Sequence, residues 1–279
     1  MTATAPTAPT AAGRARRDAR TSAAARWNPT VRLTTLLVAA ATAMLVTDPV
    51  TPAVLWLLAV AGALTAARVA PRDLALAHAA LAGFAVSLFV ANVLLRASGD
   101  VLATLGPVEV TSGALAVATS LALRTLYLGT VSVVLVATTD PVRLMTSLHQ
   151  HARLPAAATY AVLAGLRVLE QLPQEWRAIR RAQAVRDPRR RPGRLPRSGR
   201  ALASATFALL VGAVRRAERI SVALESRGLG SGPRTVAHPV PLTAGDVVAG
   251  LAVLGVVAAV LAGGAAGGWL TGPRALLAG

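Results

Sequence analysis

Five apolar segments dominate the pattern of hydrophobic and polar positions along the chain. They are Val31–Val46, Thr51–Ala67, His78–Leu95, Leu115–Ala137 and Val247–Ala266. A helix needs roughly 20 apolar residues to cross the hydrocarbon layer of a bilayer, and these segments approach or reach that length. The pattern predicts an all-α integral membrane protein with about five transmembrane helices. The first two are short and share the turn Thr47-Asp48-Pro49, which is typical of tilted or partly peripheral helices.

Residues 140–235 have a different pattern, because they are too charged for lipid and too periodic for an ordinary loop. A short helix is expected to begin at Pro141, with Asp140 as its N-cap. Two long amphipathic helices should follow, from Pro155 to Asp187 and from Ser198 to Arg227, with Gly228 as a left-handed cap. Each long helix changes from apolar to charged along its length. This predicts a cytoplasmic region of two long helices and a short one.

These patterns divide the chain into five regions. The prediction is a disordered basic cytoplasmic tail (1–30), transmembrane helices (31–139), cytoplasmic helices (140–235), a last transmembrane helix (243–266) and a C-terminal tail (267–279).

Composition agrees with a membrane protein, because 54 % of the 279 residues are hydrophobic and only 15 % are charged. The net charge of +17 would suggest nucleic-acid binding in a soluble protein. All 29 basic residues are arginine, however, and they gather in particular segments instead of covering one folded surface. We therefore expect no nucleic-acid partner.

The arginines also predict orientation, since basic residues concentrate in cytoplasmic loops. Six lie at or before Arg32, Arg68 and Arg72 lie between the second and third apolar segments, and eighteen lie from Arg143 to Arg234. The alternate loops carry none or only Arg96. A cytoplasmic N-terminus places all three clusters on the cytoplasmic side, and the C-terminal tail on the other.

Catalytic and metal-binding patterns are lacking in the sequence. There is no cysteine, and His149 and His151 are spaced so that their rings would point apart on a helix. The acidic residues are scattered. A nucleotide-binding loop needs a lysine, and the chain has none. We expect no cofactor, no metal site and no catalysis.

Two short arginine motifs end the long predicted helices. They are Ala182-Gln183-Ala184-Val185-Arg186-Asp187 and Ala223-Leu224-Glu225-Ser226-Arg227-Gly228. One alone would be read as a last-turn arginine favoured by the helix dipole. Their repetition at two helix ends in one region favours a shared binding role.

The sequence resembles the transmembrane T component of energy-coupling-factor (ECF) transporters, the family that includes the cobalt-type permease subunit. That family carries two arginine motifs, usually Ala-Arg-Gly, at the ends of its cytoplasmic coupling helices. The resemblance implies that the two long helices of this chain cross, as the coupling helices of the family do. The two motifs above match in order and spacing, as do Thr138-Thr139-Asp140-Pro141 and Asn28-Pro29. Asp187 and Ser226 depart from the family pattern, which has glycine and alanine there.

The resemblance implies a non-catalytic coupling subunit of a bacterial plasma-membrane importer for vitamins or for transition metals such as cobalt or nickel. Its implied partners are two cytoplasmic ABC ATPase subunits and a small membrane substrate-binding (S) subunit. Its implied ATPase-binding residues are Arg186 and Arg227, with the neighbouring residues Gln183, Val185, Asp187, Glu225, Ser226 and Gly228.

Three other functions fit the sequence less well. A conventional ABC importer permease is the main alternative, but it predicts one short coupling helix instead of two long ones. A polytopic membrane enzyme would need clustered acids or histidines near a membrane face. A secondary transporter would be expected to contain internal repeats, and none is evident.

Overall fold

The computed structural model describes residues 19–96, 99–105, 108–186, 198–229, 232, 236 and 239–268. Its elements are α2 (Ala23–Arg26), α3 (Pro29–Ala43), α4 (Val50–Thr65), α5 (Pro71–Leu95), β1 (Val101–Leu105), β2 (Val108–Thr111), α6 (Ser112–Thr138), α7 (Pro141–His151), α8 (Ala156–Val185), α9 (Gly199–Ser226) and α10 (Ala244–Ala266). They form two compact units: a membrane unit, residues 1–144 with 241–279, and an arginine-rich unit, residues 145–240.

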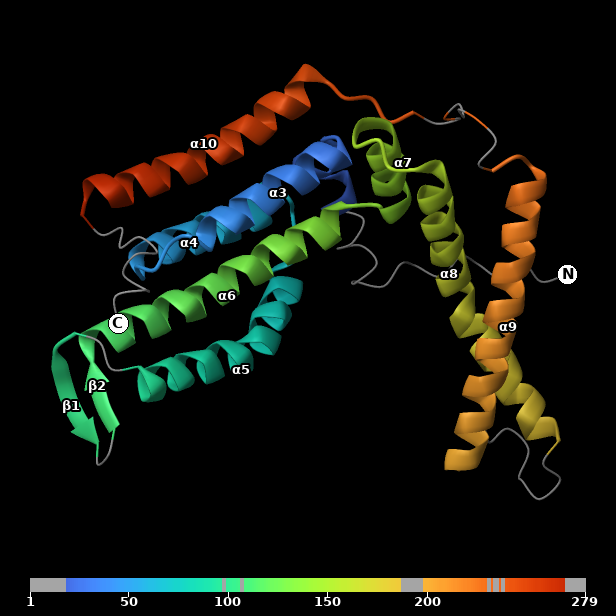
Figure 1. The fold of residues 1–279 in the computed structure, drawn as a ribbon, viewed down its shortest axis with the longest axis horizontal. Coiled ribbons are helices and arrows are strands. Elements are labelled where there is room, and N and C mark those ends of the chain that lie inside the picture. The colour runs from blue at the N-terminus through green and yellow to red at the C-terminus, as the bar shows by residue number, and fades with distance from the viewer. Residues whose placement is uncertain are drawn as a thin grey trace, which may run out of the picture. The chain divides into compact units, whose positions relative to one another are not determined.

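The membrane unit is built from α3, α4, α5, α6 and α10, which run side by side (Figure 1). Helix α6 packs against α5 and α4, and α10 packs against α3. Among the described residues, α5, α6 and α10 are long and apolar enough to cross a bilayer, with 25, 27 and 23 residues. The apolar helices α3 and α4 have only 15 and 16 residues, in agreement with the short spans that the sequence indicated.

Capping residues explain where several of these helices begin. The Asn28 side chain accepts a hydrogen bond from the Thr30 amide (2.9 Å), and Pro29 occupies the first turn of α3. Thr243 and Asp246 form a reciprocal capping box at the start of α10. The Asp246 carboxylate also accepts from the Asn28 amide (3.0 Å), so the first turns of α3 and α10 are held together.

Small residues allow the helices to approach closely. A Cβ atom at Gly129 of α6 would overlap the Leu81 side chain of α5, and one at Gly250 of α10 would lie 2.7 Å from Thr35 Oγ1 of α3. The core of the unit also contains small residues: it consists of Ala39, Ala43, Leu55, Tyr127 and Val257. Close packing of this kind is what associates helices in lipid, where apolar burial gives little net gain.

A polar network ties α4, α5 and α6 together inside the membrane unit. The Nε2 atom of His78 lies 3.0 Å from Trp56 Nε1 and 3.1 Å from Thr130 Oγ1, and its Nδ1 atom lies 2.8 Å from the Leu74 carbonyl. Because the indole N–H can only donate, Nε2 is the acceptor and Nδ1 carries the proton. His78 of α5 therefore links α4 and α6 through its Nε2 atom.

Two features of this unit differ from the sequence predictions. Residues 1–30 were predicted to be a disordered tail, yet Ala23–Arg26 form α2 and Pro29 begins α3; residues 1–18 lie outside the described part of the chain. The Ser22 side chain caps α2, and the Arg32 guanidinium donates to the Ala24 carbonyl (2.6 Å). The Ala24 amide donates to the Ala66 carbonyl (3.2 Å), so this segment is held against the end of α4.

The second difference is the antiparallel hairpin of β1 and β2 between α5 and α6, in a segment predicted to be a loop. Val101 pairs with Thr111, and Ala103 pairs with Val110. The hairpin leads directly into α6, since the Thr111 side chain accepts from the Ala114 amide (3.3 Å). Its two strands are too short to give a clear alternating pattern in the sequence.

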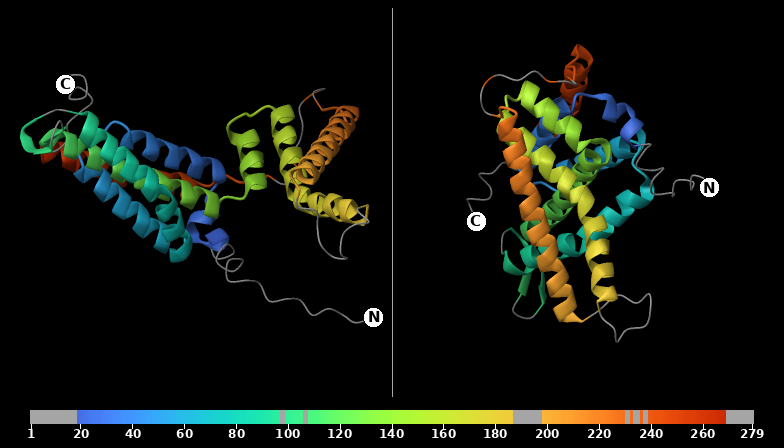
Figure 2. Two further views of the ribbon diagram at one scale, coloured as in Figure 1. Left: turned by 90° about the horizontal axis from the view of Figure 1, so that it is seen from below. Right: turned by 90° about the vertical axis from the view of Figure 1, so that its right-hand side faces the viewer.

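The arginine-rich unit consists of the last part of α7, then α8 and α9, which lie side by side in all views (Figures 1 and 2). The predicted helix boundaries agree with the structure to within one or two residues. The Ser198 side chain caps α9 by accepting from the Ala201 amide (3.3 Å). Pro173 stands inside α8, where it removes one intrahelical hydrogen bond.

Candidate partner-binding site

Helices α8 and α9 form an antiparallel pair that crosses (Figure 1). The C-terminal end of α8 lies beside the start of α9, because Gln183 Nε2 donates to the Ala201 carbonyl (3.1 Å). The prediction of two long crossing helices is confirmed. Arg216 of α9 meets Gln171 and Glu175 of α8, so the helices cross close to the middle of α8.

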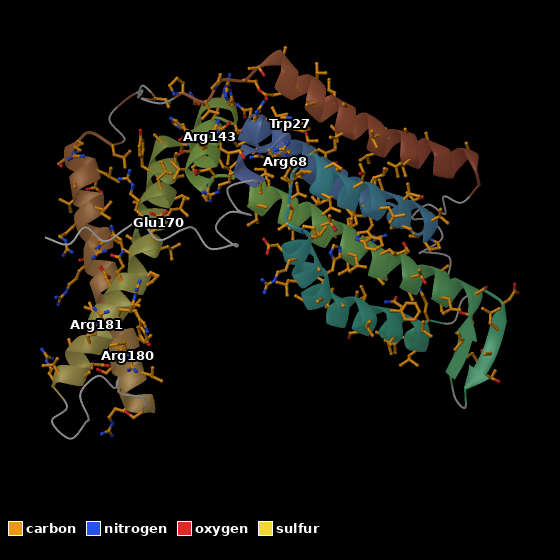
Figure 3. The ribbon with its side chains drawn as sticks, turned by 180° about the vertical axis from the view of Figure 1, so that it is seen from behind. Trp27, Arg68, Arg143, Glu170, Arg180 and Arg181 are labelled. Carbon is orange, nitrogen blue, oxygen red and sulfur yellow. The ribbon has the colours of Figure 1, made fainter. Side chains whose placement is uncertain are left out.

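Polar side chains fasten the pair where it crosses. Arg216 of α9 donates to Gln171 and to Glu175 of α8, and it forms a salt bridge with Glu175. Arg180 of α8 is only 5 % exposed; its guanidinium lies over the Trp176 ring, 5.7 Å from the centroid. Figure 3 shows Arg180 and Arg181 on the C-terminal part of α8.

Beyond the crossing, an apolar groove of about 720 Å³ separates the first half of α8 from the second half of α9. Small residues line much of its wall, among them Ala157, Ala161, Gly165, Ala213 and Ala217. The groove ends at Leu224, Glu225 and Leu229, so it reaches the second arginine motif. One end of the pair is thus closed by polar contacts, and the other is open and apolar.

The first arginine motif forms the end of α8. Arg186 is the C-cap, with its amide bonded to the Ala182 carbonyl (3.3 Å). Its side chain is exposed and has no hydrogen-bond partner among the described residues. Val185 beside it is 87 % exposed, an unusual position for a valine in a helix. Asp187 lies outside the described residues.

The second motif forms the end of α9, and its geometry depends on Gly228. This residue has φ +77°, and the amides of Gly228 and Leu229 donate to the carbonyls of Glu225 (2.8 Å) and Leu224 (3.0 Å). These two bonds define a Schellman cap, which favours glycine because a side chain would be strained there. The cap leaves Arg227 exposed at the tip of the helix.

Because the helices are antiparallel, Arg186 and Arg227 lie at opposite ends of the pair. Arg186 is level with the start of α9, and Arg227 follows its last residue. With 28 residues in α9 and a rise of 1.5 Å per residue, the two arginines are about 40 Å apart. Such a separation lets each arginine meet a different partner molecule.

The neighbouring predicted site residues divide into two groups. Val185 is exposed next to Arg186, while Gln183 is half-buried and bonded to Ala201 and to Arg180 (3.3 Å), so it holds the helix pair together. In the second motif, Glu225 accepts from Ser221 (3.1 Å) and Ser226 donates to the Ala223 carbonyl (3.0 Å). Sequence reasoning missed the contacts of Arg216, because its partners are more than 40 residues away.

The close pair of histidines is structural. His149 Nδ1 lies 2.7 Å from the Leu154 carbonyl, and His151 Nε2 lies 3.0 Å from the Val240 carbonyl. Gln150 accepts from the Val240 amide (2.8 Å), so this end of α7 anchors the segment that follows α9. Within the described part of the chain, no group of three metal-ligating side chains is found.

Comparison with known proteins shows the family of the chain. A search of curated proteins returned no similar protein. The family described as CbiQ, cobalt transport protein, matches residues 20–236, which is most of the chain and includes α8, α9 and both arginine motifs. The chain therefore belongs to the CbiQ family, whose members are the non-catalytic transmembrane T components of ECF transporters for cobalt or vitamins.

Proposed function

We propose that this T component transmits movement from two ABC ATPase subunits through α8 and α9, with Arg186 anchoring one ATPase and Arg227 the other. The observation that carries the proposal is the placement of two exposed arginines at opposite ends of one antiparallel helix pair. A movement between two ATPases bound at these ends would act on the pair as a whole, because Arg216 fastens the helices to each other.

The chemistry of each helix end supports an ATPase contact. An exposed guanidinium offers a rigid fork that pairs with a carboxylate through two hydrogen bonds. At the first end, the exposed Val185 adds an apolar contact beside the charge. At the second, the cap formed by Gly228 presents Arg227 at the tip. A helix end seated in a groove of a partner protein would use all of these features.

The remaining predicted site residues take supporting roles in this proposal. Gln183 holds the first motif, at the end of α8, against the start of α9. Glu225 and Ser226 complete the last turn before Arg227. Asp187 stays a predicted contact residue.

The S subunit is the third partner that we propose. The groove between α8 and α9 supports a contact with an apolar helix, since its alanine and glycine lining permits close approach. The membrane unit supplies the other apolar surface, with exposed residues such as Leu57, Phe84 and Leu251.

Purification in mild detergent tests the proposed assembly. The chain is expected to carry two ATPase subunits and one small hydrophobic protein, and to show no ATP hydrolysis when purified alone. The control is the same preparation made in a harsh detergent that strips partners. Purification as a single chain under every mild condition, or nucleotide turnover by the isolated chain, would contradict the proposal.

We also propose that the protein lies in a bacterial plasma membrane with its N-terminus and arginine-rich unit in the cytoplasm. Figure 3 shows Trp27 and Arg68 at the end of the membrane unit away from the β1–β2 hairpin. That end would then face the cytoplasm, as the arginine distribution favours.

Cysteine labelling tests this orientation, because the native chain has no cysteine. Glu109 on the hairpin and Glu218 on α9 are both exposed glutamates and form a matched pair. An impermeant thiol reagent should label Glu109→Cys in intact cells and label Glu218→Cys only after permeabilisation. The reverse pattern would overturn the proposed topology.

A further inference from the structure

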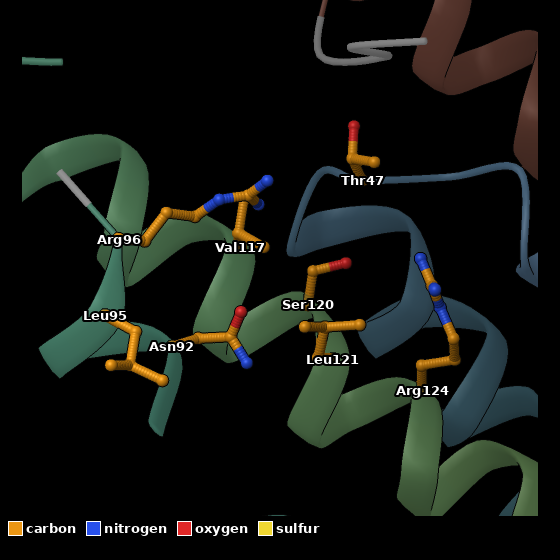
Figure 4. A pocket seen from close by; sticks show the side chains of 8 residues that line it. All are labelled: Thr47, Asn92, Leu95, Arg96, Val117, Ser120, Leu121 and Arg124. Carbon is orange, nitrogen blue, oxygen red and sulfur yellow. The ribbon is translucent and has the colours of Figure 1, made fainter. Parts of the chain in front are cut away.

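The membrane unit contains a polar hollow of about 400 Å³ at its hairpin end, and the ATPase-coupling function does not use it. Thr47, Asn92, Arg96, Ser120 and Arg124 provide its polar lining (Figure 4). They come from the α3–α4 turn, the end of α5 and the first half of α6. We call this feature the hairpin-end hollow.

The hollow exists because α3 and α4 are much shorter than α5 and α6. At the opposite end of the unit, α4 and α6 are level, since Ala63 and Ala67 pack with Val134 and Ala137. At the hairpin end, the α3–α4 turn reaches only to Arg124, whose guanidinium donates to the Val46 carbonyl. Arg124 lies twelve residues inside α6, or about 18 Å along the helix axis.

The lining is strongly biased toward hydrogen-bond donors. Two guanidinium groups face the hollow, and no carboxylate is among the residues that line it. Arg124 also contacts Met44 Sδ (4.0 Å), and its Nε atom is buried with no partner among the described residues. The Ser120 hydroxyl, on a residue only 1 % exposed, is likewise buried without a described partner. Asn92 gives one amide hydrogen to the Leu88 carbonyl (2.9 Å).

The acidic residues that are nearest in sequence to the two arginines do not line the hollow. Asp48 instead accepts a hydrogen bond from the Thr51 amide in the first turn of α4 (2.7 Å). Asp100 and Glu109 are exposed on the hairpin segment. Two arginines without a lining carboxylate, one of them deep in a transmembrane helix, are costly unless an anion or water meets them.

We propose that the hairpin-end hollow binds the phosphate group of a membrane phospholipid. A phosphate offers only acceptor oxygens, which match the arginine and hydroxyl donors of the lining. The lipid is the source that the fold favours: next to short helices a bilayer thins locally, and this brings headgroup phosphates toward the level of the α3–α4 turn. Arg96 meets the phosphate first, and Arg124 and Ser120 lie at the base of the site.

Native mass spectrometry of the purified full chain can test this proposal. The probes are phosphatidylglycerol, diacylglycerol with the same acyl chains, and inorganic phosphate. The wild-type chain should retain phosphatidylglycerol and not diacylglycerol. Each of Arg96→Gln and Arg124→Gln should reduce retention about tenfold, the effect of losing roughly one charge-assisted contact. Arg72→Gln, which removes an exposed arginine at the other end of α5, should leave it unchanged.

Arg96→Gln is the deciding variant, because the Arg96 side chain makes no hydrogen bond to a described residue and its loss should not disturb folding. Arg124→Gln also breaks the bond to Val46 and can fail to fold. Unchanged phosphatidylglycerol retention in Arg96→Gln, or equal retention of diacylglycerol, would overturn the site. Displacement of the lipid by millimolar inorganic phosphate would overturn the lipid as the occupant.

Discussion

Replacing both Arg186 and Arg227 by alanine is expected to release both ATPase subunits while the chain still inserts into the membrane. Removing one partner of a buried, hydrogen-bonded charge pair commonly costs ~2–5 kcal/mol, because the other charge is left desolvated and alone. Both residues are exposed at the ends of the α8–α9 pair, so neither change should disturb the unit itself. The measurement is a pull-down of the ATPases from mild detergent at equal expression.

The single variants and their controls test whether each arginine contributes one ATPase contact. Arg186→Ala and Arg227→Ala should each weaken one contact, and lysine at either position should restore it only in part, since lysine lacks the planar fork. Arg181→Ala and Arg219→Ala remove exposed arginines from the same two helices outside the motif positions, and they should retain both ATPases. Full retention by the double variant would mean that the two arginines only compensate the helix dipoles.

The second large effect is expected at the contact that fastens the helices together. Arg216→Glu would place a third acceptor beside Gln171 and Glu175 and replace an attraction by a repulsion. Arg216 and Glu175 are 29 % and 25 % exposed, so the pair is largely but not fully desolvated. Losing it should destabilise the α8–α9 pair by ~2–4 kcal/mol and uncouple transport from ATP hydrolysis.

Charge exchange provides the matched control. The double variant Glu175→Arg with Arg216→Glu should regain much of the lost transport and protease resistance, because the opposite charges face each other again. Arg215→Glu, at the neighbouring exposed position, should have little effect on either readout. Equal loss of transport in Arg215→Glu and Arg216→Glu would show that net charge, and not the contact with α8, is what matters.

Much of the helical arrangement could be predicted from local sequence signals. Asp140 before Pro141 caps a helix where expected, and the helix predicted to start at Ser198 begins at Gly199. Gly228 adopts the left-handed conformation predicted for it. These signals act over one helical turn, so they can be recognised without knowing the fold.

Features that depend on distant residues were not predictable in the same way. The β1–β2 hairpin, the packing of residues 19–26 against α4 and the contact of Arg216 with Glu175 all require tertiary placement. Arg124 is an intermediate case, because its charge inside an apolar segment is visible in the sequence but its partner is not. It lies well inside α6 and bonds to the Val46 carbonyl.

The parts of the candidate site were also not equally predictable. Both arginine motifs were found from their spacing, but their separation depends on the antiparallel arrangement that Gln183 and Ala201 fix. The groove beside the second motif has no local signature in an alanine-rich sequence. The sequence thus predicted candidate partner-binding residues, and the fold supplied the distance between them.

Site-directed cross-linking tests most directly the claim that each end of the α8–α9 pair holds one ATPase. Single cysteines at Val185 and at Glu225, treated with a short bifunctional reagent in the assembled transporter, should each capture one ATPase subunit. A cysteine at the exposed Arg177 near the crossing should capture neither. Capture at Arg177 with none at Val185 or Glu225 would contradict the account, because the ATPases would then contact the middle of the pair and not its ends.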